Sequence, residues 1–338
     1  MSMQRIIGSS QAWSEALEHV SQLAPIERTA LIIGERGTGK ELIAERLHFL
    51  SPRWEQPLIK VNCAAFTDSL LESELFGHES GAFTGANRQH RGRFERADQG
   101  TLFLDELGTL SDRVQEKILR VIEYGELERL GSQDTLQVDV RIVAATNADL
   151  PLMVAEGRFR GDLLDRLSFD VINLPPLRQR LADIEPLAEH FAIRMSHELG
   201  WDLFPGFTES ALGKLKEWPW PGNVRELKNV VERSVYRWGK ASEAIDKIII
   251  DPFKQSQPSI DDKITDDTNT PLEGTASKPA IPPLSEAVAN LEQSLLNKAL
   301  EEARHHQGEA AALLGLSYHQ FRGLYRKYKG EKKAGNTD

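Results

Sequence analysis

The sequence predicts an α/β fold with a parallel sheet, followed by two helical regions. Short, almost continuously apolar runs alternate with helical patterns in the first half of the chain, as strands buried on both faces of a parallel sheet require. The strand pattern stops near Pro175, and helical periodicity then dominates as far as Gly239. Helical spacing returns at Leu284, after a polar stretch. The expected strands are 30–34, 58–62, 101–105, 140–147 and 169–174.

The composition is that of an ordinary globular protein. The 338 residues are 40% apolar and 27% charged, which excludes a wholly disordered or fibrous chain. Apolar runs stay well short of the roughly 18 residues that span a bilayer, and the first residues lack the apolar core of a signal peptide. The single cysteine, Cys63, cannot form an internal disulfide. We therefore expect a cytoplasmic protein that does not insert into membranes.

The charge of the chain is unevenly distributed. The total is −10, which by itself argues against nucleic-acid binding, but residues 308–338 carry six basic and three acidic side chains. Residues 254–283 are rich in Pro, Ser, Thr and Asp, a composition typical of a flexible linker. The expected parts are an α/β subdomain (1–174), a helical lid (175–253), this linker, a DNA-binding domain (284–330) and a disordered tail (331–338).

A glycine-rich loop follows the first expected strand and precedes a helix. Its pattern, GxxxxGK, is that of a phosphate-binding loop, in which backbone N–H groups and a lysine surround the phosphates. Glu41 occupies the position where a Ser or Thr commonly binds magnesium. The alternative is a glycine turn with an incidental lysine. The predicted nucleotide-binding residues here are Gly34, Glu35, Arg36, Gly37, Thr38, Gly39, Lys40 and Glu41.

Two adjacent carboxylates end the third expected strand. Open α/β sheets bind ligands at the carboxyl ends of their strands, so Asp105 is a candidate Mg²⁺ ligand and Glu106 a candidate base for water. Two exposed acids at a strand end are the alternative on their own. Together with the phosphate loop, the pair predicts ATP hydrolysis.

Four further side chains fit such a site. Asn147 ends the fourth strand, where an amide can sense the γ-phosphate, and Asn62 ends the second, where it can hydrogen-bond Glu106. A strand-end Asn is also a common turn residue. Arg160 and Arg166 lie in one short segment and can act on the γ-phosphate of a neighbouring subunit, or form ordinary surface ion pairs.

A hexapeptide narrows the assignment further. The segment GAFTGA lacks a lysine, and its glycines allow a mobile loop that presents an aromatic side chain outward. Together with the ATPase motifs, the segment resembles bacterial enhancer-binding proteins, which are AAA+ ATPases that activate sigma-54 RNA polymerase. The resemblance implies that sigma-54 contacts the residues of this loop, which are Gly81, Ala82, Phe83, Thr84, Gly85 and Ala86.

The same resemblance implies roles for residues at matching positions. Lys40 becomes the Walker A lysine, Asp105 and Glu106 the Walker B pair, Asn62 the switch for Glu106 and Asn147 sensor I. The stretch WPGNVREL (220–227) matches sensor II, so that Arg225 reaches nucleotide and Asn223 is expected to cap a helix. Arg160 and Arg166 match the arginine-finger region, and the family works as a ring, usually a hexamer.

Three stretches, 204–209, 228–237 and 248–253, are similar to those of family members that activate phage-shock operons. Such members lack an N-terminal regulatory domain, and this chain reaches its first core strand by Ala30. The resemblance implies control in trans by a phage-shock A-type inhibitor. Trp54, in a polar stretch, is a candidate contact for that inhibitor, or else a ring packed over the sheet edge.

The basic end of the chain has the pattern of a helix-turn-helix. An alanine-rich helix at 310–314, a turn at 315–317 and a basic helix at 318–328 follow a longer helix at 284–303. We expect the apolar stripe of that longer helix to include Leu295 and Ala299. The candidate DNA contacts are His319, Arg322 and Arg326. A small solvated helical cap is the alternative.

These features predict a sigma-54-dependent activator that binds enhancer DNA, hydrolyses ATP with Mg²⁺ and remodels closed promoter complexes to open ones. One alternative is a DNA-binding regulator whose nucleotide site only controls assembly. Another is an AAA+ chaperone or replication initiator, which needs no GAFTGA loop.

Overall fold

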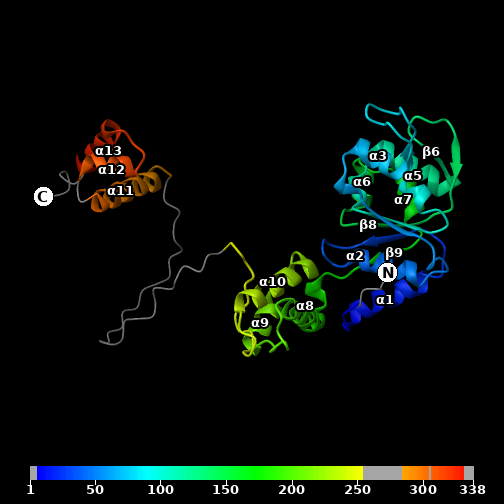
Figure 1. The fold of residues 1–338 in the computed structure, drawn as a ribbon, viewed down its shortest axis with the longest axis horizontal. Coiled ribbons are helices and arrows are strands. Elements are labelled where there is room, and N and C mark those ends of the chain that lie inside the picture. The colour runs from blue at the N-terminus through cyan, green and yellow to red at the C-terminus, as the bar shows by residue number, and fades with distance from the viewer. Residues whose placement is uncertain (1–5, 254–283, 304–305, 331–338) are drawn as a thin grey trace. The chain divides into compact units, whose positions relative to one another are not determined.

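The computed structural model describes residues 6–253, 284–303 and 306–330, so the expected linker and tail lie outside the described residues. The chain divides into one compact unit at 1–257 and another at 258–338 (Figure 1). Within the described residues, no helix combines the length and apolar character needed to cross a membrane.

A five-stranded sheet forms the centre of the first unit. All its pairings are parallel, in the order β2-β5-β8-β1-β9, which confirms the predicted parallel sheet. β2 and β5 have the expected bounds, whereas β1, β8 and β9 are shorter than their apolar runs. The strands are β1 (Ala30–Ile33), β2 (Leu58–Asn62), β5 (Thr101–Asp105), β8 (Arg141–Thr146) and β9 (Val171–Asn173).

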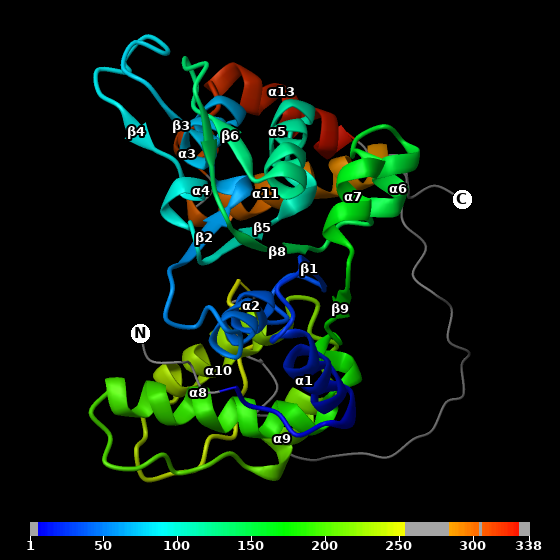
Figure 2. The ribbon, with the colours of Figure 1, turned by 90° about the vertical axis from the view of Figure 1, so that its right-hand side faces the viewer.

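Helices cover both faces of the sheet, as Figure 2 shows. Successive strand residues point to opposite faces, so Leu102 packs into one core while Phe103 packs into the other. This is why the strand sequences are apolar almost without interruption. One face carries α1 (Gln11–Leu23) and α2 (Lys40–Phe49). The other carries α3 (Asp68–Phe76), α4 (Arg93–Arg96), α5 (Asp112–Tyr124), α6 (Leu150–Ala155) and α7 (Gly161–Leu167).

Two small hairpins extend from the second face. The GAFTGA segment lies between β3 (Gly77–His78) and β4 (His90–Arg91), and the second hairpin is formed by β6 (Glu126–Glu128) and β7 (Thr135–Gln137). The hairpins touch, because the Leu130 N–H donates to the Gly77 carbonyl (3.0 Å) and the Glu79 N–H to that of Leu130 (3.0 Å).

The lid is all-helical, as predicted, with a core of its own. Trp220 is wholly buried in that core and donates its indole N–H to the Leu215 carbonyl at 2.8 Å. Short 3₁₀ turns at Leu177–Gln179 and Leu181–Asp183 connect the sheet to the lid. The lid helices are α8 (Ile184–Glu198), α9 (Glu209–Glu217) and α10 (Asn223–Trp238).

The second unit contains α11 (Leu284–Glu302), α12 (Gln307–Leu313) and α13 (Tyr318–Gly330). The expectation for Leu295 was wrong, because its side chain is 47% exposed and Leu296 is buried in its place. Ala299 is buried as predicted. Helical spacing allows either leucine, and packing against α12 and Phe321 selects the second.

Candidate active site and partner-binding loop

The phosphate loop connects β1 to α2 and is closed by its own hydrogen bonds. Lys40 is only 7% exposed, and its Nζ donates to the carbonyl oxygens of Gly34 (3.0 Å) and Glu35 (3.4 Å). The Thr38 hydroxyl also donates to the Glu35 carbonyl, at 2.9 Å. Gly39 has φ +105°, a conformation that only glycine adopts at low cost. The lysine ammonium therefore lies inside the curve of the loop, where phosphate oxygens can replace the carbonyls.

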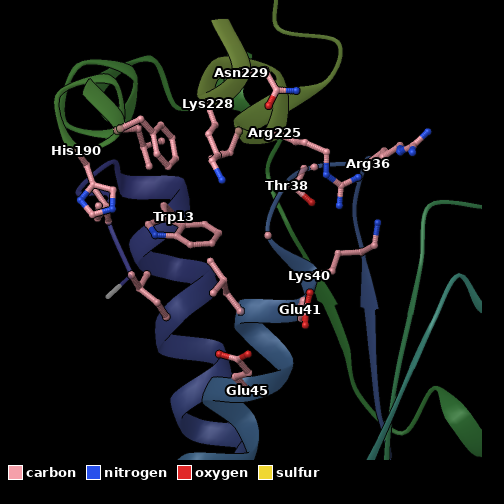
Figure 3. A pocket seen from close by; sticks show the side chains of 18 of the residues that line it. Trp13, Arg36, Thr38, Lys40, Glu41, Glu45, His190, Arg225, Lys228 and Asn229 are labelled. Atoms are coloured by element: carbon pink, nitrogen blue, oxygen red, sulfur yellow. The ribbon is translucent and has the colours of Figure 1, made fainter. Parts of the chain in front are cut away.

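A cavity of about 750 Å³ lies between this loop and the lid (Figure 3). Seven Lys or Arg and four Asp or Glu side chains are among its lining residues, a balance that suits a polyphosphate. The sequence-predicted residues that the structure brings together in this lining are Arg36, Gly37, Thr38, Gly39, Lys40, Glu41, Asp105, Glu106 and Arg225. The lid therefore contributes directly to the site.

Several lining residues were not predicted from the sequence. Arg180 is nearly buried, stacks over the Trp13 ring with its guanidinium carbon 4.3 Å from the ring centroid, and donates to the Thr38 carbonyl at 3.1 Å. Burial lowers the pKa of Arg180 to about 10. Lys228 points from α10 into the cavity, and His190 lines it from α8 (Figure 3). No local motif marks these residues, because they converge only when the lid packs near α1.

The two acids lie at the carboxyl end of β5. Glu106 has φ +57° and ψ +46°, an uncommon conformation for a residue other than glycine, and its N–H donates to Asp105 Oδ1 at 2.9 Å. The buried Cys63 lies nearby, and its burial, with the charge of Asp105, raises the pKa of its thiol to about 12. The thiol therefore stays protonated and neutral near pH 7.

The two predicted asparagines lie at the same edge of the sheet but outside the cavity lining. Asn62 is in register with Asp105 on the adjacent strand. Its Oδ1 accepts from the Ala64 N–H at 3.0 Å. Asn147 directly follows β8 and is exposed.

Glu41 is paired within the site. Its Oε1 lies 2.9 Å from the Lys60 ammonium, which also binds Glu45. Desolvation lowers the pKa of Lys60, but its two carboxylate partners raise it further, so that the net shift is upward. Lys60 thus neutralises part of the negative charge that Glu41 brings to the position of the usual Ser or Thr.

The expectation that Asn223 caps a helix was wrong. α10 begins at Asn223 itself, and its N-cap is Gly222, whose N–H donates to Glu226 Oε2 at 2.7 Å. The Asn223 side chain instead lies buried between the phosphate loop and Leu177, where it binds the Glu35 carboxylate. Arg178 donates to both oxygens of that carboxylate, at 2.6 and 2.8 Å.

Arg160, which directly precedes α7, and Arg166, within α7, both lie outside the cavity lining. Arg160 pairs with Asp162 at 2.7 Å, and Arg166 pairs with Glu123 at 2.9 Å. Both guanidinium groups are partly exposed to solvent.

The GAFTGA loop is held at its base and presents Phe83 at its tip. The Gly81 N–H donates to the Ala86 carbonyl at 2.7 Å, which closes the loop. The Phe83 side chain is 47% exposed and rests edge-on against His78, with ring centroids 4.9 Å apart. The side-chain positions at Gly81 and Gly85, both with positive φ, face open space.

Two further groups of predicted residues are exposed. Trp54 lies in the turn between α2 and β2 with 55% of its surface accessible. In the second unit, His319, Arg322 and Arg326 are exposed on α13, whereas Phe321 packs inward. The basic and apolar faces of this helix are therefore separated, as the sequence predicts.

Comparison with known families agrees with this architecture. Residues 6–173 match the sigma-54 interaction domain, residues 178–256 an AAA+ ATPase lid domain, and residues 287–329 the Fis family of bacterial regulatory proteins. The chain therefore belongs to the sigma-54-dependent transcriptional activators. It is an AAA+ ATPase that binds ATP and carries a DNA-binding helix-turn-helix.

Individual relatives support the same assignment. The Psp operon transcriptional activator of Escherichia coli K12 is 58% identical over 325 residues, covering 96% of this chain and 98% of that protein. The Nif-specific regulatory protein of Azotobacter vinelandii is 42% identical over 93% of this chain, and ZraR of Salmonella typhimurium is 51% identical over 68% of it. This chain spans 57% and 52% of those two longer proteins.

Two solved structures of NtrX have a similar fold. NtrX from Brucella abortus in complex with ATP has a TM-score of 0.70 and 29% identity, over 96% of this chain and 69% of that one. NtrX in complex with ADP has a TM-score of 0.69 and 30% identity, over 96% and 68%.

Proposed function

We propose that this activator binds enhancer DNA and uses ATP hydrolysis to remodel closed complexes of sigma-54 RNA polymerase into open ones, at a phage-shock operon. The observation that carries the proposal is the GAFTGA loop, which presents Phe83 to solvent on the subdomain that holds the phosphate loop. Near-complete coverage of the Psp operon activator at 58% identity supports the choice of operon.

The cavity residues suit ATP hydrolysis with magnesium. Lys40 and Arg225 would bind phosphate oxygens, and Arg36, Thr38 and the loop glycines would surround them. Asp105 lines the cavity, and its carboxylate suits Mg²⁺, which when bound would neutralise phosphate charge. Glu106 would orient and deprotonate water, with Asn62 switching it and Asn147 sensing the γ-phosphate.

The site would be completed by a second copy of the chain. Arg160 directly precedes α7 and Arg166 lies within it, and neither residue lines the cavity of its own subunit. In a ring, which we infer is a hexamer, one or both would reach the γ-phosphate of the neighbouring subunit and stabilise its transition state.

The second unit would supply the enhancer contacts. The exposed His319, Arg322 and Arg326 lie on the helix that occupies the recognition position of a helix-turn-helix. We take residues 284–330 as this domain, 1–174 and 175–253 as the two ATPase subdomains, 254–283 as the linker and 331–338 as the tail.

Regulation would come from another protein in the cytoplasm. The exposed Trp54 offers an aromatic contact for a phage-shock A-type inhibitor, because a large apolar side chain in water gains free energy on burial. The turn that carries it lies at the amino-terminal end of β2, opposite the nucleotide edge.

Trapping the hydrolytic state tests the proposal. The full chain is incubated with ADP and aluminium fluoride, which imitates the transferred phosphate, and is then passed with sigma-54 over a sizing column. We expect co-elution with the trapped protein and none with ADP alone or with Lys40→Ala. If rings form but sigma-54 does not co-elute with them, the proposal is contradicted. That result would favour a regulator whose nucleotide site only controls assembly, or an AAA+ ATPase with another partner.

A further inference from the structure

Asn223 joins three separate segments through one buried side chain. Its Nδ2 donates to Glu35 Oε2 at 3.0 Å and to the Arg36 carbonyl at 3.1 Å, and its Oδ1 accepts from the Leu177 N–H at 2.7 Å. The residue is wholly buried and has φ +52°, which an asparagine tolerates better than most residues. Both the oxygen and the nitrogen of the Asn223 side-chain amide are therefore hydrogen-bonded.

The Glu35 carboxylate is also bound by Arg178. The guanidinium makes two hydrogen bonds to it, at 2.6 and 2.8 Å, in the paired geometry that gives such contacts their directional strength. Glu35 belongs to the phosphate loop, whereas Arg178 belongs to the turn that leads into the lid. We call Glu35, Arg178 and Asn223 the lid latch.

The backbone beside the latch approaches the phosphate loop very closely. The Val224 N–H donates to the Gly37 carbonyl at 3.0 Å. A Cβ atom at Gly37 would lie 2.3 Å from the Gly222 carbonyl oxygen and 3.0 Å from the Arg225 Cβ. The start of α10 therefore packs directly against the phosphate loop, and the two segments cannot move closer together.

We propose that the lid latch positions Arg225 against the phosphates by holding the first turn of α10 in register with the phosphate loop. Arg225 follows Asn223 by two residues, lines the cavity and points toward the loop (Figure 3). Asn223 acts through Arg225 and is a positioning residue. The inference depends on the phosphate-binding role proposed for Arg225.

A double-mutant cycle tests this inference in the full-length chain. The affinity for a fluorescent ADP and the kcat and KM for ATP are measured for Asn223→Ala, Arg225→Ala and the double variant. We expect each single change to weaken nucleotide binding about tenfold, and the double change to weaken it little further, because Asn223 has no effect once Arg225 is absent. Lys216→Ala, which removes an exposed lid ion pair to Glu185 (2.8 Å), is the control and should leave affinity unchanged.

The affinity of the double variant tests the lid latch, and that of Arg225→Ala tests the role of Arg225. Losses that multiply to about a hundredfold in the double variant would overturn the latch while leaving the role of Arg225 intact. An Arg225→Ala variant with normal affinity would overturn the role of Arg225 itself, and the latch with it.

A second pair of variants, in which donor and acceptor are exchanged between positions 223 and 35, tests the proposal if Asn223→Ala does not fold. Asn223→Asp keeps the acceptor for the Leu177 N–H but sets a carboxylate against that of Glu35. We expect it to weaken ADP binding more than tenfold, and the added change Glu35→Gln to restore affinity to within about threefold, because the new amide can donate to the new carboxylate. Failure of Glu35→Gln to restore affinity would overturn the proposal.

Discussion

Lys40 is a buried cation whose ammonium donates only to the backbone carbonyls of Gly34 and Glu35 in the contacts described. We expect ATP to replace these carbonyls with phosphate oxygens. Lys40→Ala should weaken ATP binding by about 30-fold or more, since a hydrogen bond to a charged group contributes roughly 2 kcal/mol. Titration with a fluorescent ATP analogue measures the loss, with Lys216→Ala as the control. Unchanged affinity would refute the phosphate site.

Glu35 offers a test by pH. Hydrogen bonds from Arg178, and then from Asn223, lower the pKa of Glu35 from 4.5 to about 2. Because its pKa is lower in the folded than in the unfolded chain, Glu35 stabilises the fold above about pH 4.5, and this contribution is lost as the pH falls toward 2. The difference in Tm between the wild type and Glu35→Gln should therefore be constant near neutral pH and shrink below about pH 4.5. A difference that stays constant into acid would contradict the ion pair with Arg178.

At the scale of elements, the loop between β3 and β4 separates partner binding from hydrolysis. Its tip lies on an exposed hairpin, and its residues are absent from the cavity lining. Thr84→Ala should leave ATP turnover within about twofold of normal and abolish open-complex formation, because the substitution touches no cavity residue. Phosphate release and an open-promoter assay measure the two activities. Normal activation by this variant would disprove the assignment of the loop.

A separate prediction concerns DNA binding by the exposed face of α13. Arg322→Ala should weaken enhancer binding by about 1–3 kcal/mol and leave ATP turnover unchanged, if the side chain contacts a base edge. Binding is measured at several salt concentrations on enhancer and unrelated DNA. Glu309→Ala, on the exposed surface of α12, is the matched control. Equal losses on both DNAs would show that Arg322 contacts phosphate and carries no base specificity.

At the scale of the whole molecule, a shared site between subunits can be tested by mixing. Subunits with Lys40→Ala lack the lysine but keep Arg166. Subunits with Arg166→Ala lack the arginine but keep Lys40. Each alone should be reduced roughly 10³-fold or more in hydrolysis. In a random equal mixture about a quarter of the interfaces are competent, so ATPase activity should return. Replacing the first partner by the double variant Lys40→Ala/Arg166→Ala should abolish the recovery.

The absence of recovery in mixed rings would contradict an arginine supplied in trans. Repeating the mixture with Arg160→Ala shows whether that arginine also acts across the interface. Arg160 and Arg166 are bound to different acidic partners, Asp162 and Glu123, so the two variants disturb different ion pairs.

The sequence predicts the strands, the phosphate loop and the acidic pair, because each depends on residues that are close together in the chain. Strands buried on both faces must be apolar throughout, and this pattern located β1, β2, β5, β8 and β9 to within a few residues. The phosphate loop depends on glycines at fixed positions before Lys40, which is why a short motif predicts it. The Asp105–Glu106 pair was placed by its position at a strand end.

The tertiary structure decided what depends on residues that are distant in the chain. Helical spacing could not choose between Leu295 and Leu296, and packing against α12 chose Leu296. Arg180 and Trp13 lie far apart in sequence yet stack beside Thr38, and Asn223 binds Glu35 where its motif predicted a cap. The sequence by itself determined the strands, the phosphate loop and the class of ATPase, since each is encoded in neighbouring residues. How the lid meets the phosphate loop was decided only by tertiary packing, because those contacts form once the sheet and the lid have both folded.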